Sequence, residues 1–464
     1  MFCNSCGTQL ADDAKFCTKC GARTDAAVAA PQAAAAAAPV EPAYAPAPAR
    51  SRLPLVLGGG FAVLAAAAAG WVLLGGPGGG GGVSLGGASG WQARFSEWPK
   101  PVTVGNRCGA IDQSGKLVIN PTYDWVSDFD AKGMAVFTQG QLSGYMNAKG
   151  EVVINPQFQA AAPFDGGDLA PVMIGQKWGF IDRQGKTVIN PQFDGAEAFD
   201  AEGGAWVMIG ENYGRIDREG KFTINPQFRF HQQFENGLAS VQVGEKWGLV
   251  DTSGKLVLNP QFDSLYGPFD KGLYVAGQGG RWGMVDREGK YAVQPVFDSI
   301  NAVKGDDLIA VKQGERWGFA DLTGKIVVAP TYNVASNFMG GDLAPVGIAA
   351  GGSEFANRWG YVDRTGKLVI NPQFDSAEPF VDGLAIVGVG NKYGLIDRTG
   401  TYVVPLQYTW MWRQNFDFNA GAAGFAPTIN TNNDLQRAGV LDSKGKVLVA
   451  PQFDSIGCNV ESGD

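Results

Sequence analysis

The stretch KWGFIDRQGKTVINPQFD, residues 177–194, decides the fold class because it recurs with small changes along most of the chain. Its first glycine, Gly179, has counterparts in nine other copies, at successive intervals of 35, 35, 35, 34, 35, 35, 42, 34 and 45 residues. The ten glycines are Gly109, Gly144, Gly179, Gly214, Gly248, Gly283, Gly318, Gly360, Gly394 and Gly439. A near-constant period over ten copies is typical of a repeat architecture.

Each copy contains the pattern of a β-hairpin. Two runs rich in β-branched and aromatic residues flank a D-x-x-G-K turn, such as Asp182–Lys186, in which aspartate accepts backbone N–H bonds and glycine takes a positive φ. Pro191 ends the second run, and Phe193 is the expected core anchor. A third short strand, such as GLASVQV at 237–243, completes the copy. Residues 101–464 are therefore predicted to form an all-β array of three-stranded units that bury their apolar faces by stacking.

Such an array is either an open β-solenoid (a superhelix) or a closed, propeller-like ring. Thirty-five residues are few for a four-stranded blade, and ten blades are many for a propeller, so the sequence favours the open form. Cys108 and Cys458 lie in the first and last copies; they would be far apart in an open array and close enough for a disulfide in a ring. Cys108, Ser143 and Ala438 replace the aromatic residue before the glycine, as expected of capping units at free ends.

The signature WG-[FLMY]-[IVA]-D-x-x-G-K is similar to that of the bacterial WG-repeat family. Tryptophan precedes the glycine at Trp178, Trp247, Trp282, Trp317 and Trp359, and tyrosine does so at Tyr213 and Tyr393. The resemblance covers most of residues 105–458. It implies a β-rich repeat scaffold and no particular activity.

The N-terminus carries a candidate metal module. Residues 1–23 contain Cys3, Cys6, Cys17 and Cys20 in the pattern C-x2-C-x10-C-x2-C. Four thiolates fill a tetrahedral Zn²⁺ shell and leave no position for water or substrate, so the predicted site is structural. Two disulfides or a redox C-x-x-C are the alternatives, against which the two glycine-followed pairs argue. The module resembles short zinc-ribbon domains of bacterial membrane proteins, which implies zinc and a reducing cytoplasm.

The next segments predict a membrane anchor. Residues 24–52 are rich in alanine and proline and are expected to be a disordered linker. Residues 53–74 carry no charge and would span about 33 Å as a helix, enough for a bilayer core. Arg50 and Arg52 precede them, which places the N-terminus in the cytoplasm and the repeats outside the inner membrane. A signal peptide would need a much shorter leader, and a buried core helix would show an amphipathic face. Residues 75–100 are a glycine-rich spacer.

Charge and composition exclude some functions. The formal net charge is -8; the region before the apolar segment has five basic and four acidic residues, 5 - 4 = +1, which leaves -9 for the repeats. An acidic array lacks the excess of basic charge that is typical of proteins that bind nucleic acid. The single histidine, His231, is expected to be a surface or packed residue. With no phosphate loop and no distinct carboxylate pair, the sequence predicts a protein that is not an enzyme.

Several features are candidates for a ligand surface. Trp410 and Trp412 lie outside the repeat consensus and suit an exposed patch. The regular Trp and Tyr row either stacks sugars or, as we favour, packs in the core. The turn aspartates suit turn geometry better than calcium. The insertions at 347–358 and 418–434 are either part of a binding face or loops without a binding role.

Together these features predict a membrane-anchored, extracytoplasmic scaffold that binds a protein or a cell-wall glycan without catalysis. The alternative is an envelope sensor in which the repeats signal to a cytoplasmic partner of the zinc ribbon.

Overall fold

The computed structural model describes residues 98–165, 167–350, 353–414, 426–430, 437–442 and 444–458, all within the compact unit Gly60–Asp464. The described residues form strands, turns and one 3-10 helix, η2 (Asp270–Gly272). The predicted zinc module, linker and apolar segment 53–74 lie outside the described residues. Within the described part of the chain, no helix is long and apolar enough to cross a membrane.

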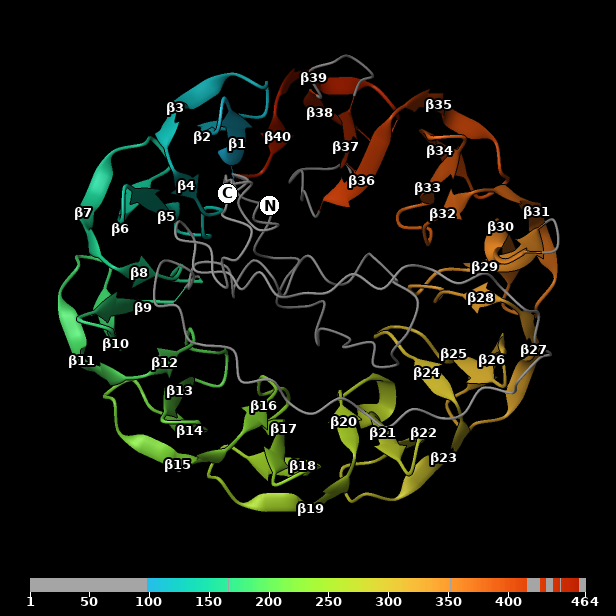
Figure 1. Ribbon diagram of the computed structural model, residues 1–464, viewed down its shortest axis with the longest axis horizontal. Helices are drawn as coiled ribbons and strands as arrows, with labels where there is room; N and C mark the ends of the chain where they lie inside the picture. Colours follow the sequence, from blue (N-terminus) through green and yellow to red (C-terminus); the bar gives the residue numbers. More distant parts are fainter. Residues whose placement is uncertain are drawn as a thin grey trace, which may run out of the picture. The chain divides into compact units, whose positions relative to one another are not determined.

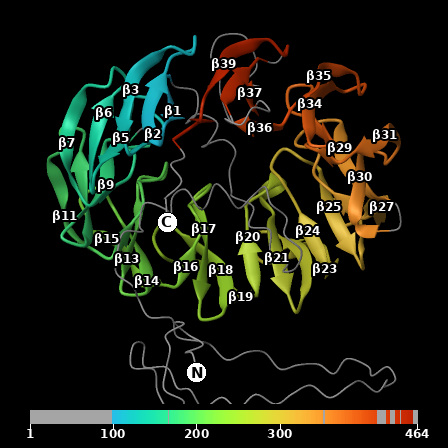
Figure 2. The same cartoon turned by 45° about the horizontal axis from the view of Figure 1, so that its top comes forward.

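Ten four-stranded antiparallel sheets stand as blades around a ring (Figure 1). The ring seen obliquely is shown in Figure 2. Blade 1 has the strand order β40-β1-β2-β3 from the inside outward, blade 2 has β4-β5-β6-β7, and each later blade takes the next four strands up to blade 10, β36-β37-β38-β39. The inner strands are β4 (Trp125–Val126), β8 (Ala160–Ala161), β12 (Gly195–Ala196), β16 (Phe230–His231), β20 (Ser264–Tyr266), β24 (Ser299–Asn301), β28 (Val334–Ala335), β32 (Ser376–Ala377), β36 (Trp410–Gln414) and β40 (Ser455–Ile456).

In blades 1 to 9 the other three strands are longer than the inner one, whereas in blade 10 the inner strand β36 is as long as β37. The second strands are β1 (Lys100–Val104), β5 (Met134–Gln139), β9 (Leu169–Ile174), β13 (Ala205–Ile209), β17 (Leu238–Val243), β21 (Tyr274–Gln278), β25 (Leu308–Gln313), β29 (Leu343–Ala350), β33 (Leu384–Val389) and β37 (Ala426–Asn430). The third strands are β2 (Arg107–Ile111), β6 (Leu142–Asn147), β10 (Lys177–Asp182), β14 (Asn212–Ile216), β18 (Lys246–Asp251), β22 (Arg281–Val285), β26 (Arg316–Asp321), β30 (Ser353–Asp363), β34 (Lys392–Asp397) and β38 (Ala438–Leu441). The outer strands are β3 (Leu117–Tyr123), β7 (Val152–Phe158), β11 (Thr187–Phe193), β15 (Phe222–Phe228), β19 (Leu256–Phe262), β23 (Tyr291–Phe297), β27 (Ile326–Tyr332), β31 (Leu368–Phe374), β35 (Tyr402–Tyr408) and β39 (Val447–Phe453).

The predicted all-β repeat array is confirmed, but its units have four strands and not three. The additional strand is the inner one, which in blade 4 consists of Gly195 and Ala196 paired with Met208 and Val207. A strand of two residues shows no alternation of apolar and polar side chains, so sequence patterning could not reveal it. Its shortness is also the reason why 35 residues suffice for a four-stranded blade.

The array forms a closed ring. The prediction of an open solenoid is therefore wrong, and the alternative prediction of a propeller-like ring is confirmed. C-terminal β40 pairs with β1 through Ile456 opposite Val102 and Ser455 opposite Thr103. A shared apolar cluster joins blade 1 to blade 10 through Val102, Val440 and Val449. With its ends joined the array needs no caps, so the capping interpretation of Cys108, Ser143 and Ala438 is also wrong.

A contact between a turn glycine and an aliphatic side chain joins each blade to the preceding one. A Cβ placed on the turn glycine Gly150 of blade 2 would lie 3.1 Å from Ile119 Cγ1 of blade 1. In the same way, Gly115 of blade 1 faces Val449 Cγ1 of blade 10 at 3.0 Å. The turn of one blade therefore packs on an aliphatic side chain of its neighbour, and this relation continues across the closing seam.

The core anchors and turns form as the sequence predicts. Phe193 and Phe228 are buried at the ends of outer strands, and Trp178 packs at the edge of the same cluster as Phe193. In the turn, Asp182 Oδ1 accepts the backbone N–H groups of Gln184 and Lys186 at 3.0 and 2.9 Å. Turn geometry accounts for these aspartates, as expected.

Candidate functional site

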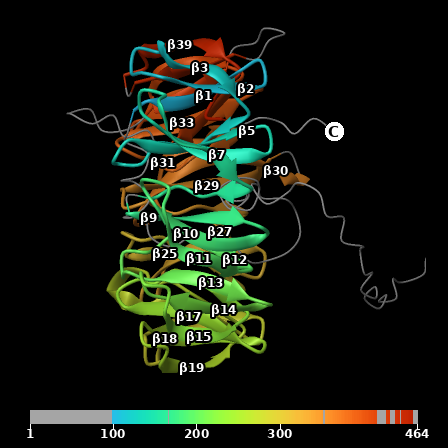
Figure 3. The ribbon, with the colours of Figure 1, turned by 90° about the vertical axis from the view of Figure 1, so that its left-hand side faces the viewer.

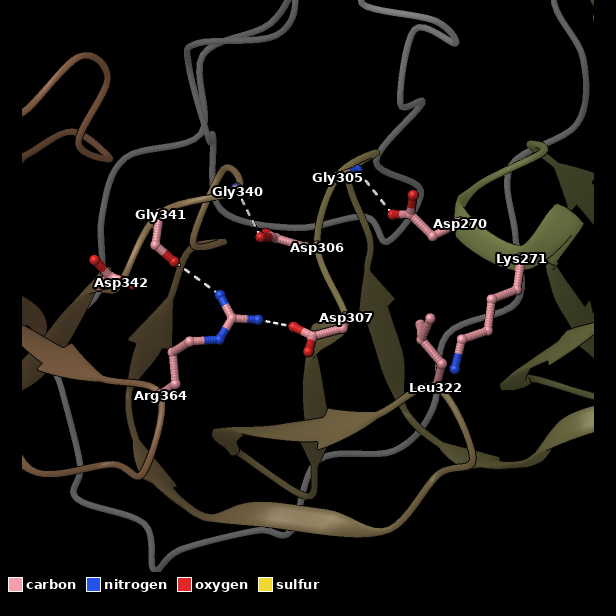
Figure 4. Close-up of a pocket in the computed structure, with 10 residues that line it drawn as sticks. All are labelled: Asp270, Lys271, Gly305, Asp306, Asp307, Leu322, Gly340, Gly341, Asp342 and Arg364. Atoms are coloured by element: carbon pink, nitrogen blue, oxygen red, sulfur yellow. Dashed lines mark hydrogen bonds and ion pairs between the residues drawn. The ribbon is translucent and has the colours of Figure 1, made fainter.

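A groove of about 510 Å³ opens on the ring between the loops of blades 6, 7 and 8 (Figure 4). Its wall is formed by the loops before β21, β25 and β29 and by the turns after β26 and β30. The side chains that determine its chemistry are Asp270, Lys271, Asp307, Leu322, Asp342 and Arg364. The groove therefore spans three consecutive repeats.

The groove lies where blade 7 departs from the repeat pattern. The loop between the inner and second strands has Phe269 in blade 6 and Phe338 in blade 8, but no aromatic residue in blade 7, where Val303 and Lys304 stand. The following turn has Arg364 in blade 8, but Leu322 in blade 7. Blade 7 thus lacks the aromatic and arginine pair that its neighbour has, in which the Arg364 guanidinium lies 4.8 Å from the centre of the Phe338 ring.

In blade 8 the turn position that Leu322 occupies in blade 7 is taken by Arg364, which contacts two neighbouring loops. Its guanidinium donates to Gly341 O at 2.7 Å and forms an ion pair with Asp307 of the preceding blade. Arg183 of blade 3 does the same, donating to Gly167 O and pairing with Asp130 of blade 2 at 2.5 Å. In blades 3 and 8 the turn arginine therefore joins the loop of its own blade to that of the blade before.

Aspartates of the groove also link neighbouring loops. Asp306 is buried and accepts the backbone N–H groups of Met339 and Gly340 at 2.9 and 2.7 Å. Burial raises the pKa of Asp306, and these hydrogen bonds oppose that rise in part. Asp270 Oδ2 accepts the Gly305 N–H at 2.7 Å. These contacts hold the three loops in register and fix the wall of the groove.

The groove carries an excess of negative charge. Four aspartates, at positions 270, 306, 307 and 342, face Lys271 and Arg364 of the lining and Arg398, which pairs with Asp342 at 3.4 Å, so the sum is -4 + 3 = -1. The carboxylates of Asp307 and Asp342 are 75% and 76% exposed. Leu322, by contrast, is buried in the apolar cluster beneath the groove. Such a lining offers acceptors for a cationic group.

His231 is a packed residue, one of the two outcomes that the sequence analysis expected. Its ring stacks on Trp206 with centroids 4.2 Å apart and meets the edge of Tyr213 at 4.6 Å. Its Nε2 lies 3.4 Å from Glu197 Oε1. The imidazole thus belongs to an aromatic cluster between blades 4 and 5.

Cys108 and Cys458 form a disulfide whose Cα atoms are 5.6 Å apart. It joins β2 of blade 1 to the segment that follows β40. The Val126 N–H of blade 2 points to Cys458 Sγ at 3.2 Å. The bond therefore lies at the closing seam of the ring.

The remaining candidates are only partly described. Trp410 and Trp412 lie in β36, where Trp410 is 41% exposed and pairs with Asn430. The side chain of Trp412 lies outside the described residues. Of the two insertions, 347–358 lengthens the β29–β30 hairpin, which projects from the ring in the edge-on view of Figure 3. The other, 418–434, falls largely outside the described residues.

The predicted zinc ligands, Cys3, Cys6, Cys17 and Cys20, also lie outside the described residues. In the part that is described, no group of three or more His, Cys, Asp or Glu side chains is placed to hold a metal ion. The groove itself was not found from the sequence. A comparison of repeats position by position would have indicated it, because blade 7 lacks both the loop aromatic residue and, at Leu322, the turn arginine of blade 8.

A closed ring of ten blades with an N-terminal cysteine module defines a propeller-like repeat protein. The chain belongs to the family of proteins with the WG-containing repeat. The family model matches residues 109–142, 144–178, 178–213, 213–247, 247–282, 282–317, 317–348, 359–393, 393–424 and 439–463. Residues 2–24 match a zinc-ribbon domain. No match was found among curated protein sequences.

Three solved structures resemble the chain at low sequence identity. A structure of the eukaryotic initiation factor is 9% identical, with a TM-score of 0.47 over 78% of this chain and 98% of the other. The dihydro-heme d1 dehydrogenase NirN is 10% identical, with a TM-score of 0.32 over 59% and 73%. The extracellular domain of a putative one-component system from B. thetaiotaomicron is 9% identical, with a TM-score of 0.27 over 67% and 55%. With TM-scores below 0.5, these likenesses establish neither fold nor function.

Proposed function

We propose that the ring is a non-enzymatic binding scaffold, held at the outer side of the inner membrane by residues 53–74, that binds a protein partner. The observation that carries this proposal is the mixed-charge groove formed by the loops of blades 6, 7 and 8. The repeated residues serve packing and turns, whereas the groove arises where the repeat pattern changes. Membership of the WG-repeat family and the zinc-ribbon match are compatible with a scaffold.

Zn²⁺ fits the donor set of the N-terminal module. Cys3, Cys6, Cys17 and Cys20 would supply four thiolates, the ligand set of closed structural zinc sites. Their role would be to fold a segment that has little apolar core of its own. Loss of zinc on treatment with a chelator, measured by metal analysis of the full-length protein, is the expected result.

The scaffold proposal is tested by crosslinking in intact cells from a photoreactive residue at Asp342. Asp342 is exposed at the groove, so a bound protein is expected to be captured there. The same photoreactive residue at Glu211, which is 86% exposed on blade 4, is the matched control. Capture of the same partners from both positions, or of none, would contradict a protein-binding groove.

The side of the membrane is tested with a membrane-impermeant thiol reagent after mild reduction of intact cells. The outward orientation predicts that Cys458 is labelled and that the four N-terminal cysteines are not. Labelling of the N-terminal cysteines alone would reverse the proposed topology.

A cell-wall glycan is the second candidate ligand, favoured by the exposed aromatic ring of Trp410. Aromatic faces are common platforms for stacking. Retention of the protein on purified peptidoglycan, lost when Trp410 is changed to alanine, is the expected result for this candidate.

The sensor alternative differs in its need for residues 1–23. Deletion of this segment is expected to leave binding by the ring intact under the scaffold proposal. Under the sensor alternative the same deletion abolishes a cellular response to ligand while binding persists.

A further inference from the structure

Among the described residues, Asp270 in the groove over blade 7 has no basic partner, whereas three acids at the same loop position each have one, supplied from a different part of a blade. In the loop between the inner and second strands, an acid follows the aromatic residue. Three of these acids form ion pairs with a basic side chain, namely Asp130 with Arg183, Asp200 with Arg215, and Glu235 with Lys304. Asp270 occupies the same position in blade 6, yet no basic side chain of the described residues forms an ion pair with it.

The missing cation has a cause in the sequence. In blades 3 and 8, the second residue of the turn is an arginine that reaches an acid in the loop of the preceding blade. In blade 7 this residue is Leu322, and the preceding loop is the one that carries Asp270. Leucine cannot pair with the carboxylate, so the acid faces the groove, and its Oδ2 is engaged by the Gly305 N–H.

We propose that the groove binds an arginine side chain of a protein partner, whose guanidinium takes the place of the missing cation beside Asp270. This inference rests on the proposed scaffold function and names the chemistry that the scaffold recognises. A guanidinium presents planar donors that suit carboxylates, which favours arginine over lysine beside Asp270. Figure 4 shows Asp270 and Leu322 on the same side of the groove, with Arg364 on the other.

The charges around this position favour a cation from outside. Arg364 is already engaged by Asp307 and Gly341, so it does not neutralise Asp270. Lys271, from the same η2 turn as Asp270, is the cation that competes for the groove. A net charge of -1 remains after Lys271, Arg364 and Arg398 are counted.

The test uses the full-length protein and a fluorescein-labelled peptide, acetyl-Gly-Ser-Arg-Ser-Gly-amide, with binding followed by anisotropy. A second peptide carries citrulline, which keeps the shape of arginine without its charge. The arginine peptide is expected to bind at least about tenfold more tightly, the effect of one hydrogen-bonded charge pair. Equal affinity of the two peptides, or no binding of either, overturns the proposal.

Two variants test the position within the groove. Leu322→Arg restores the arginine of the repeat and is expected to occupy the site from within, so affinity falls about tenfold. Asp270→Asn preserves the shape of the side chain and is expected to cause a similar loss. Leu322 is buried, so its replacement by arginine could unfold the protein. The melting temperature of Leu322→Arg shows whether it is folded. Asp270→Asn leaves the packing of the core unchanged.

Matched controls separate recognition from general attraction. Asp382→Asn removes the same charge from an exposed loop of blade 9, outside the groove, and is expected to leave affinity unchanged. An equal loss in Asp270→Asn and Asp382→Asn overturns the proposal. Lys271→Gln is expected to increase affinity by removing the competing cation. The partner captured by crosslinking can also be tested. If it binds Leu322→Arg and the native protein equally, the proposal of an arginine site is overturned, whereas the proposed scaffold function is not.

Discussion

At the scale of single residues, the glycine of each WG pair determines where the outer strand lies. A Cβ on Gly179 would lie 2.5 Å from Ile189 O and 2.7 Å from Pro191 N, both backbone atoms of the outer strand. The pairing register of β10 and β11 shifts between Trp178 and Phe180, at this glycine. The outer strand thus crosses close over the third strand, and no side chain fits between them.

Replacing Gly179 with alanine is therefore expected to lower the free energy of unfolding by about 3 kcal/mol, since the backbone atoms it meets cannot rotate away. Gly175→Ala in the same blade is the matched control. That glycine has a φ of +60° but nothing within 4 Å of an added Cβ, so about 1 kcal/mol is expected. Urea denaturation of both variants measures the difference, and equal losses would contradict the steric account.

Blade 4 replaces apolar core positions with a buried ion pair. Arg215 is 2% exposed and binds Asp200 through two hydrogen bonds, at 2.7 and 2.8 Å. Its guanidinium also lies 4.1 Å from the centre of the Phe234 ring of blade 5. Gly204 makes room for it, because an added Cβ there would collide with the guanidinium.

Asp200→Asn is expected to destabilise the protein by about 3 to 5 kcal/mol, because it leaves a buried positive charge without its partner. Asp263→Asn breaks the exposed pair with Lys246 and is expected to cost less than about 1 kcal/mol. Chemical denaturation of the two variants gives the comparison. A loss below about 1 kcal/mol in Asp200→Asn would show that Arg215 is not effectively desolvated.

At the scale of elements, the hairpin turns depend on ionised aspartates. The pKa values of Asp251, Asp321, Asp363 and Asp397 lie below the ordinary value of 3.8, mainly because the serine or threonine two residues later donates a hydrogen bond to each carboxylate. Backbone N–H groups of the turn add to the effect. A carboxylate with a lowered pKa in the folded state stabilises the fold above its unfolded pKa, and this contribution is lost as the pH falls through the folded pKa.

The turns therefore predict a loss of stability below about pH 4. The midpoint of urea denaturation is expected to be level between pH 7 and 5 and to fall toward pH 3. The buried Asp306 acts in the opposite direction, because its raised pKa means that protonation favours the fold. Ser253→Ala removes the donor to Asp251 and is expected to weaken the acid dependence. An unchanged midpoint at pH 3 would exclude this role of the turns.

At the scale of the whole molecule, closure depends on two short contacts at the C-terminus. β40 adds the inner strand to blade 1, and the disulfide between Cys108 and Cys458 fixes the segment behind it across 350 residues of sequence. All other blades receive their four strands from consecutive sequence. Blade 1 is therefore the one blade whose completion requires both ends of the repeat array.

Reduction of the disulfide is expected to lower the free energy of unfolding by about 3 to 5 kcal/mol, because a long loop of the unfolded chain is released. Denaturation with and without a reducing agent measures the loss. The double variant Cys108→Ser, Cys458→Ser is the control and should be insensitive to the reductant. Equal stability of the oxidised and reduced forms would show that the paired β-strands and apolar seam suffice for closure.

The sequence by itself determined the local structure of the repeats. The spacing of Trp178, the D-x-x-G turn and Phe193 predicted a hairpin and a buried anchor, because turn chemistry and apolar patterning act within a few residues. The zinc-ribbon match over residues 2–24 supports the N-terminal module, whereas zinc binding and the membrane role of residues 53–74 remain predictions from the sequence. The packing of the WG aromatic residues follows from the same local pattern.

Only the tertiary structure decided closure, the inner strand and the groove. Whether ten stacked units open or close depends on small rotations between blades, which add up over the array and leave no mark in any single copy. The inner strand of two residues forms because its neighbour offers an edge, and the groove forms because Asp270, Leu322 and Arg364 come from three repeats. Contacts between distant residues decide all three features, and local propensity does not encode them.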